Sequence, residues 1–167
     1  LINIEFFINK PPDKEKIKGK VYLVGAGPGD FKLITLKGLE CVQKADIIIY
    51  DRLVSSRLLA FAKPGTELIY VGKRTEHHTV DQEKINHLLV DKANEGKVVA
   101  RIKGGDPCIF GRGGEEAEVL AENEIPFEVV SGVSSAYAVP AYAGIPATYR
   151  GLASGVAFVT GHENPNK

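Results

Sequence analysis

Short apolar runs alternate with amphipathic segments along most of this chain. Runs of this length, bounded by glycine, proline or charged residues, are typical of buried parallel strands. They occur at residues 21–25, 47–50, 67–71, 98–102 and 127–130, and residues 156–160 are a sixth candidate. Strands that alternate with helices predict an α/β domain, with a mostly parallel five- or six-stranded sheet and helices on both faces.

The segments between these runs carry helix-start signals. Thr35 is suited to cap a helix that turns Leu36 toward the core, and residues 55–62 predict a second, short helix. Thr79 and Gln82 have the spacing of a capping box at the start of a third helix. These starts all follow a predicted strand, as the alternation requires.

A glycine-rich stretch, residues 103–116 with the sequence KGGDPCIFGRGGEE, separates the fourth strand from a further helix. Each glycine costs a strand or helix interior about 1 kcal/mol, so five of them predict a loop. Glu115 and Glu116 then fall in the first turn of the following helix. Loops of this kind, between a strand and a helix, are where open α/β sheets bind ligands.

Other polar loops also follow predicted strands. They lie at residues 26–32, 51–55, 72–78 and 131–135. The carboxyl ends of parallel strands meet at one edge of a sheet, so these loops and the glycine-rich stretch are expected to share one cleft.

Composition excludes several classes of partner and location. The formal net charge is zero, with 25% charged residues, which gives no support to a nucleic-acid partner. The longest apolar runs are too short to span a bilayer, and the N-terminus lacks the features of a signal peptide. Two cysteines form no disulfide framework. We therefore expect a cytoplasmic protein without a membrane or nucleic-acid partner.

The first loop, GAGPGD at residues 25–30, only partly matches a dinucleotide-binding loop. Asp51 lies about twenty residues on, where a ribose-binding carboxylate belongs, but Asp30 replaces the third glycine and Pro28 removes an N–H donor. A cationic nucleoside without a phosphate chain fits the carboxylates of Asp30 and Asp106 better. S-adenosylmethionine, a sulfonium, has that character.

Six motifs, in this order, resemble one family, the tetrapyrrole methylases (class III methyltransferases), and within it the uroporphyrinogen-III C-methyltransferases. The motifs are GAGPGD, YDRLVS at 50–55, VGKR at 71–74, the glycine-rich stretch, SGVSSA at 131–136 and PAYAGIPATYRG at 140–151. The resemblance runs from Gly19 to about His162. It implies transfer of methyl groups from S-adenosyl-L-methionine to C2 and C7 of uroporphyrinogen III, giving precorrin-2 for sirohaem and cobalamin.

The resemblance also implies roles for individual residues. Asp51 is the expected proton acceptor and Lys73 the expected proton donor. The expected cofactor-binding residues are Pro28, Gly104, Gly105, Asp106, Ile109, Ser134 and Ser135. Several bases are candidates to meet the carboxylates of the substrate: Arg52, Lys73, Arg74, Lys103, Arg112 and Arg150.

Each assignment has a plainer alternative. Asp51 is also suited to cap the turn that follows it, and Lys73 to be a solvated loop charge. Gly111, Gly113 and Gly114 fit turn geometry and a helix start. The pair His77-His78 has no companion at ligand spacing, so no metal site is predicted. Cys108, Tyr137 and Tyr142 are expected to be packing residues.

The resemblance divides the chain into an extension or linker (1–19), an N-terminal α/β domain (20–163) and the start of a connection to a missing C-terminal domain (164–167). The absence of methionine, even at position 1, fits a fragment. A full-length protein would be expected to form a homodimer. A non-catalytic truncated remnant remains the alternative, and a dehydrogenase is a more distant one.

Overall fold

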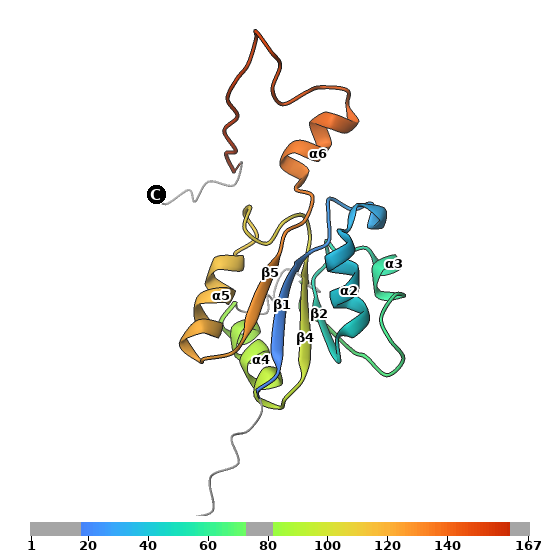
Figure 1. Ribbon diagram of the computed structural model, residues 1–167, viewed down its shortest axis with the longest axis vertical. Coiled ribbons are helices and arrows are strands. Elements are labelled where there is room, and N and C mark those ends of the chain that lie inside the picture. The colour runs from blue at the N-terminus through green and yellow to red at the C-terminus, as the bar shows by residue number, and fades with distance from the viewer. Residues whose placement is uncertain (1–17, 73–81, 161–167) are drawn as a thin grey trace, which may run out of the picture.

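The computed structural model describes residues 18–72 and 82–160, and its centre is a five-stranded parallel sheet in the order β3-β2-β4-β1-β5. Figure 1 shows the strands running in one direction between two layers of helices. The strands are β1 (Lys20–Gly25), β2 (Ile47–Tyr50), β3 (Glu67–Tyr70), β4 (Val98–Lys103) and β5 (Phe127–Val130). The predicted fold class and its first five strands are confirmed.

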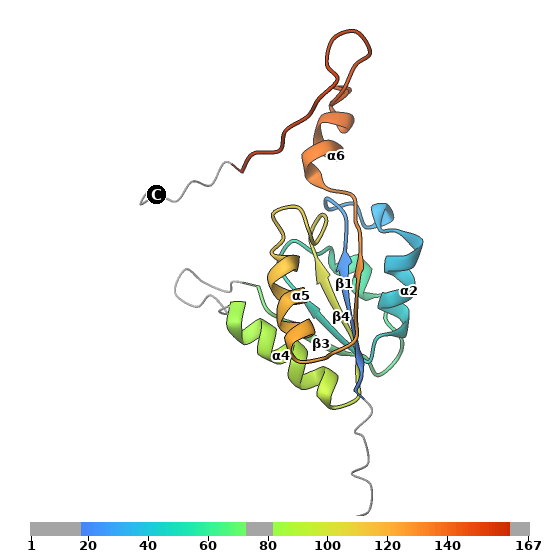
Figure 2. The ribbon, with the colours of Figure 1, turned by 60° about the vertical axis from the view of Figure 1, so that its left-hand side comes forward.

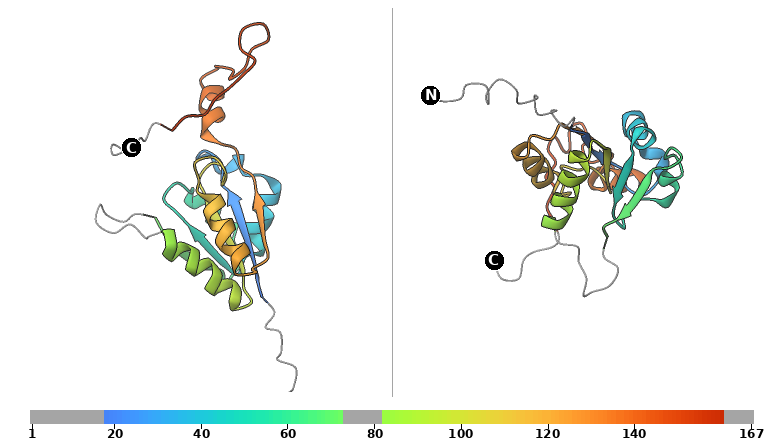
Figure 3. Two further views of the ribbon diagram at one scale, coloured as in Figure 1. Left: turned by 90° about the vertical axis from the view of Figure 1, so that its left-hand side faces the viewer. Right: turned by 90° about the horizontal axis from the view of Figure 1, so that it is seen from below.

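The helices are divided between the two faces of the sheet. α4 and α5 cover one face, and α2 and α3 cover the other (Figures 2 and 3). Their bounds are α2 (Leu36–Lys44), α3 (Ser56–Leu59), α4 (Gln82–Asn94), α5 (Gly113–Glu122) and α6 (Ser135–Tyr142), and a short 3-10 helix, η1, spans Phe31–Leu33.

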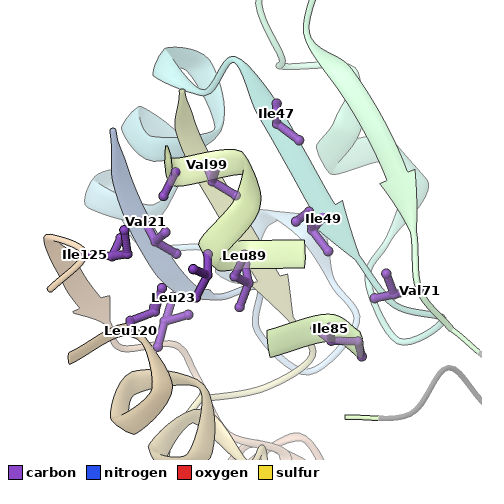
Figure 4. Packing of buried hydrophobic residues seen from close by; sticks show 12 residues of the cluster. Val21, Leu23, Ile47, Ile49, Val71, Ile85, Leu89, Val99, Leu120 and Ile125 are labelled. Atoms are coloured by element: carbon purple, nitrogen blue, oxygen red, sulfur yellow. The ribbon is translucent and has the colours of Figure 1, made fainter. Parts of the chain in front are cut away.

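Each face of the sheet has its own apolar cluster, because alternate residues of a strand point to opposite sides. On the α4/α5 side, Leu23, Ile49 and Val99 pack against Leu89 and Leu120, as Figure 4 shows. The α2/α3 cluster contains Ile48, Ala100, Ile102, Val42 and Leu58.

The same alternation decides where the charges of β4 lie. Arg101 and Lys103 follow Val99 at two-residue steps, so all three point toward α4 and α5. Two cations therefore enter the interface between the sheet and α5.

The start of α2 agrees with the sequence in one respect and not in another. The Thr35 hydroxyl oxygen accepts a hydrogen bond from the Gly38 N–H at 3.1 Å, so the predicted cap is confirmed. The expectation that Leu36 faces the core is wrong. Leu36 is 83% exposed, because the buried face of α2 is formed by Gly38, Cys41 and Val42. Thr79 of the predicted capping box lies outside the described residues.

The chain after β5 leaves the sheet. α6 lies beyond the carboxyl edge, and the chain after it first runs away from the layers and then turns back, so that Val159 and Thr160 line the cleft described below (Figures 1 and 3). Residues 156–160 form no strand, so the sixth candidate is wrong, since no described strand lies beside them. Tyr137 and Tyr142 are 40% and 72% exposed rather than interior, because α6 packs on neither face.

Candidate functional site

A cleft of about 990 Å³ opens at the carboxyl edge of the sheet. Every predicted site residue that the structure describes lines it, and these residues come from four loops. They are Pro28, Asp51, Gly104, Gly105, Asp106, Ile109, Ser134 and Ser135. Lys73 lies outside the described residues, as do Arg74, His77 and His78. The expected convergence of loops is therefore observed for these four, while the role of each residue stays a prediction.

The first loop and the glycine-rich loop are joined by their backbones. The Gly105 N–H donates to the Gly27 carbonyl at 2.7 Å, and the Gly27 N–H donates to the Gly105 carbonyl at 3.2 Å. Gly27 and Gly105 have φ of 82° and 66°, a left-handed conformation that side chains strain. Gly25 is equally constrained, since a Cβ there would stand 2.6 Å from the Gly105 carbonyl oxygen.

Asp106 joins the glycine-rich loop to the loop after β5. Its two carboxylate oxygens accept from the Cys108 N–H at 2.8 Å and the Gly132 N–H at 2.9 Å. The carboxylate is thus engaged with backbone. Asp30, the other carboxylate that favoured a cationic nucleoside in the sequence, does not line the cleft: it accepts from the Lys32 N–H and caps η1.

Asp51 follows β2 and is held from two sides. Its Oδ1 accepts from the Leu53 N–H at 2.9 Å, so the turn-capping alternative is correct as a description of that oxygen. Its Oδ2 lies 3.6 Å from Nη2 of Arg101, and a quarter of the side chain remains exposed. The capping bond therefore leaves one carboxylate oxygen facing the cleft wall.

Beside Asp51 lies a buried charge cluster, which we define as Arg101, Lys103 and Glu116; its two cations line the cleft and Glu116 lies behind them. The Glu116 Oε1 accepts from Arg101 Nε at 3.0 Å and from Lys103 Nζ at 2.8 Å. Burial and the neighbouring Arg101 lower the pKa of Lys103, and Glu116 opposes that shift. The sequence did not predict the pairing of Arg101 with Glu116. A usable signal was present, since Arg101 and Lys103 stand at alternate positions of an otherwise apolar strand and so point to the same face.

The remainder of the glycine-rich loop is strained. Phe110 and Arg112 both line the cleft with left-handed φ of 54° and 56°. Gly113 begins α5, in agreement with the helix-start interpretation. Cys108 was expected to pack but is exposed, since its backbone N–H is held at Asp106 while its side chain faces outward.

Two of the candidate bases line the cleft, Lys103 and Arg112. Arg112 forms a two-point ion pair with Glu115. Arg52 and Arg150 are exposed and do not line it. Within the described ranges, no group of three or more histidine, cysteine, aspartate or glutamate residues has the arrangement of a metal site. In the same ranges, no helix combines the length and apolarity that crossing a bilayer requires.

The parallel sheet and its glycine-lined cleft are those of a methylase domain, and the family model of the tetrapyrrole (corrin/porphyrin) methylases matches residues 20–167. The chain belongs to that family. It is 59% identical over 144 residues to uroporphyrinogen-III C-methyltransferase of Bacillus subtilis (strain 168), covering 86% of this chain and 56% of that protein.

Solved structures give the same result. Uroporphyrin-III C-methyltransferase from Thermus thermophilus is 50% identical, with a TM-score of 0.70, over 80% of this chain and 56% of that one. A structure of that enzyme complexed with S-adenosylhomocysteine is 48% identical, with a TM-score of 0.67, over 82% of this chain and 53% of the other. The chain spans little more than half the length of these relatives.

Proposed function

We propose that this chain is the cofactor-binding part of an S-adenosyl-L-methionine-dependent C-methyltransferase that acts on uroporphyrinogen III at C2 and C7 and gives precorrin-2. The observation that carries the proposal is the convergence of four loops, each bearing predicted site residues, on one cleft. The names of the relatives agree with it, and one relative was solved with the demethylated cofactor.

The cleft fits such a cofactor in size and lining. Its volume lies at the upper end of the 300–1,000 Å³ that is usual for small-molecule sites, at about 990 Å³. Gly104 and Gly105 present backbone without side chains, and Pro28, Ile109 and Ala136 add apolar surface. We expect Gly104, Gly105, Ile109, Ser134 and Ser135 to hold the cofactor, which supplies an electrophilic methyl group on a sulfonium sulfur.

We propose that Asp51 takes the proton that the substrate carbon loses. One oxygen is fixed by the Leu53 N–H, and Arg101 lies beside the other, so the carboxylate is oriented before substrate binds. Asp51→Asn keeps the turn-capping bond and removes the base. We expect kcat to fall at least tenfold in a full-length protein, with little change in cofactor affinity.

Positive charge on the cleft wall fits an acidic substrate. Arg112 lines the cleft with 57% of its side chain exposed, whereas Arg101 and Lys103 line it as buried cations that are bonded to Glu116. Guanidinium and ammonium groups bind carboxylates through charge-assisted hydrogen bonds. We infer that uroporphyrinogen III, which carries several carboxylates, enters from this side.

Calorimetry tests the binding half of the proposal. Titration of the chain with S-adenosyl-L-methionine is expected to give one site per chain. No heat at millimolar ligand would favour a non-catalytic remnant that folds without holding cofactor. Fluorescence titration with NADH addresses the dehydrogenase alternative, for which we expect no binding.

The substrate half needs a separate experiment. A full-length protein that carries this sequence, incubated with uroporphyrinogen III and S-adenosyl-L-methionine, is expected to add two methyl groups, detected by mass spectrometry. Uroporphyrinogen recovered unchanged would contradict the assigned substrate. A singly methylated end product would contradict the paired C2 and C7 assignment.

We further propose that the full-length protein is a cytoplasmic homodimer without a nucleic-acid partner. The apolar side chains exposed on α6 support a protein interface there, since monomeric proteins rarely leave such groups clustered in water. They include Tyr137, Val139 and Tyr142. Analytical ultracentrifugation that finds only monomer at micromolar concentration would contradict this proposal.

A further inference from the structure

The charge cluster contains a carboxylate that the reaction proposed above does not use. Glu116 is fully buried and does not line the cleft, yet two cations of the cleft wall bond to it. We propose that Glu116 is a positioning residue, which fixes Arg101 and Lys103 at the cleft wall and, through Arg101, orients Asp51. Only the last step rests on the proposed function.

The bonding of Glu116 is one-sided. Its Oε1 accepts from Arg101, Lys103 and also Gln82, whose Nε2 lies 3.3 Å away. Its Oε2 is buried and has no hydrogen-bond partner among the described residues. A carboxylate whose only purpose is packing is expected to satisfy both oxygens. Concentrating the donors on one oxygen instead brings the two cationic side chains together.

Arg101 transmits this placement to the cleft. Its guanidinium is fixed on three sides: Nε bonds Glu116, Nη1 donates to the Ile102 carbonyl at 3.1 Å, and Nη2 faces Asp51. Only 3% of the residue is exposed, so solvent cannot replace a lost partner. A displacement of Glu116 therefore moves the guanidinium, and with it the charge beside Asp51.

The pKa of Lys103 depends on the same carboxylate, that of Glu116. The charged groups that act on its ammonium are Arg101 on β4, Glu116 on α5 and Asp51 after β2, and Lys103 itself acts on Glu115. Burial and Arg101 lower the pKa of Lys103, whereas Glu116 raises it by charge and by hydrogen bonding. Without Glu116, two like charges would face each other in a buried site.

The test replaces the carboxylate with an amide of the same shape. Glu116→Gln is compared with Glu118→Gln, which removes an equal charge from an exposed position of α5. The lysine side chains of this chain are titrated by NMR. In Glu116→Gln the pKa of Lys103 is expected to fall below its wild-type value, and in Glu118→Gln to stay unchanged. An unchanged Lys103 titration in Glu116→Gln would overturn the proposal.

Two further variants keep the test decisive if Glu116→Gln does not fold. Glu116→Asp retains the negative charge on a shorter side chain. The pKa of Lys103 is therefore expected to stay close to its wild-type value in this variant. Asp51→Asn removes the other anion, and the pKa of Lys103 is expected to fall there too. A Lys103 pKa that stays at its wild-type value in Asp51→Asn would show that the cluster does not connect Lys103 with Asp51.

Kinetics separate positioning from simple structural support. In a full-length protein, Glu116→Gln is expected to lower kcat at least tenfold per folded molecule, with cofactor affinity changed less than twofold. Loss of folded protein with normal kcat would leave Glu116 only a structural role and overturn the proposal. If wild-type protein shows no methyl transfer while Lys103 responds as stated, the proposed function fails and the placement of the cations by Glu116 stands.

Discussion

Two carboxylates, Glu116 and Asp46, bond to residues that are distant in the sequence. Glu116 joins α5 to β4 through Arg101 and Lys103. The Asp46 Oδ2 accepts from the Val98 N–H at 2.9 Å, and its Oδ1 lies 2.7 Å from Lys63 Nζ. The first site is buried and the second lies at the surface, so their loss has different consequences.

Glu116→Gln is expected to lower the free energy of unfolding by about 3 kcal/mol, because it removes the carboxylate to which two buried cations bond and leaves only the more distant Asp51 as their counter-charge. Urea denaturation measures this difference. Glu118→Gln, at an exposed position of the same helix, is expected to change it by less than about 0.5 kcal/mol. Equal stabilities of the two variants would contradict the buried charge cluster.

Asp46 gives a prediction about pH. The hydrogen bond from Lys63, and then that from the Val98 N–H, lower the pKa of Asp46 below its ordinary 3.8. The unfolded chain then binds this proton more tightly than the folded chain does. The stabilisation that Asp46 provides is therefore present above the ordinary pKa of its carboxyl group, and it is lost as the pH falls through the lowered pKa of the folded chain.

Asp46→Asn is expected to make the acid loss of stability shallower below about pH 4, as followed by thermal melting. Asp91→Asn, at an exposed position of α4, serves as the control and should keep the wild-type slope. Parallel slopes for Asp46→Asn and wild type would show that the carboxylate has no such linkage.

At the scale of elements, α2 offers a direct test of local signals. Its only described side-chain cap is Thr35, whose hydroxyl receives the Gly38 N–H. Thr35→Ala is expected to cost about 1 kcal/mol of stability, since an amide at the helix start loses its acceptor. Thr35→Ser retains the oxygen and should lie near wild type in the same denaturation experiment. A neutral Thr35→Ala would contradict the cap.

Local signals predicted the elements because five apolar strands and their following helices each carry their own pattern. The failures came where a partner decides the outcome. Residues 156–160 have the composition of a strand but no neighbour to pair with. Tyr137 and Tyr142 lie on a helix that packs on neither face of the sheet. Composition alone could not reveal either circumstance.

The same limit applies to the site. Loop convergence followed from parallel strand order, so placing Pro28, Asp51 and Asp106 around one cleft was predictable. The pairing of Arg101 with Glu116 was not, because it depends on how far α5 is rotated above β4. Asp30 was misplaced for a related reason: its own turn provides a nearer hydrogen-bond donor than the cleft does.

At the scale of the whole molecule, the described domain separates into a packed sandwich and an open C-terminal portion. The sandwich supplies most of the cleft wall, formed by the ends of β1, β2, β4 and β5, and α6 lines the remainder together with Val159 and Thr160. α6 and the residues after it expose most of their large apolar side chains. Because most of the wall belongs to the sandwich, we expect cofactor recognition to begin there.

The most direct test is an NMR titration of the isotopically labelled chain with S-adenosylhomocysteine. The account predicts that the amide resonances of Gly104, Gly105, Ile109 and Ser134 shift with a common dissociation constant, while those of α4 on the covered face do not. Shifts confined to surfaces away from the cleft, or none at millimolar ligand, would contradict the central claim that these loops form the cofactor site.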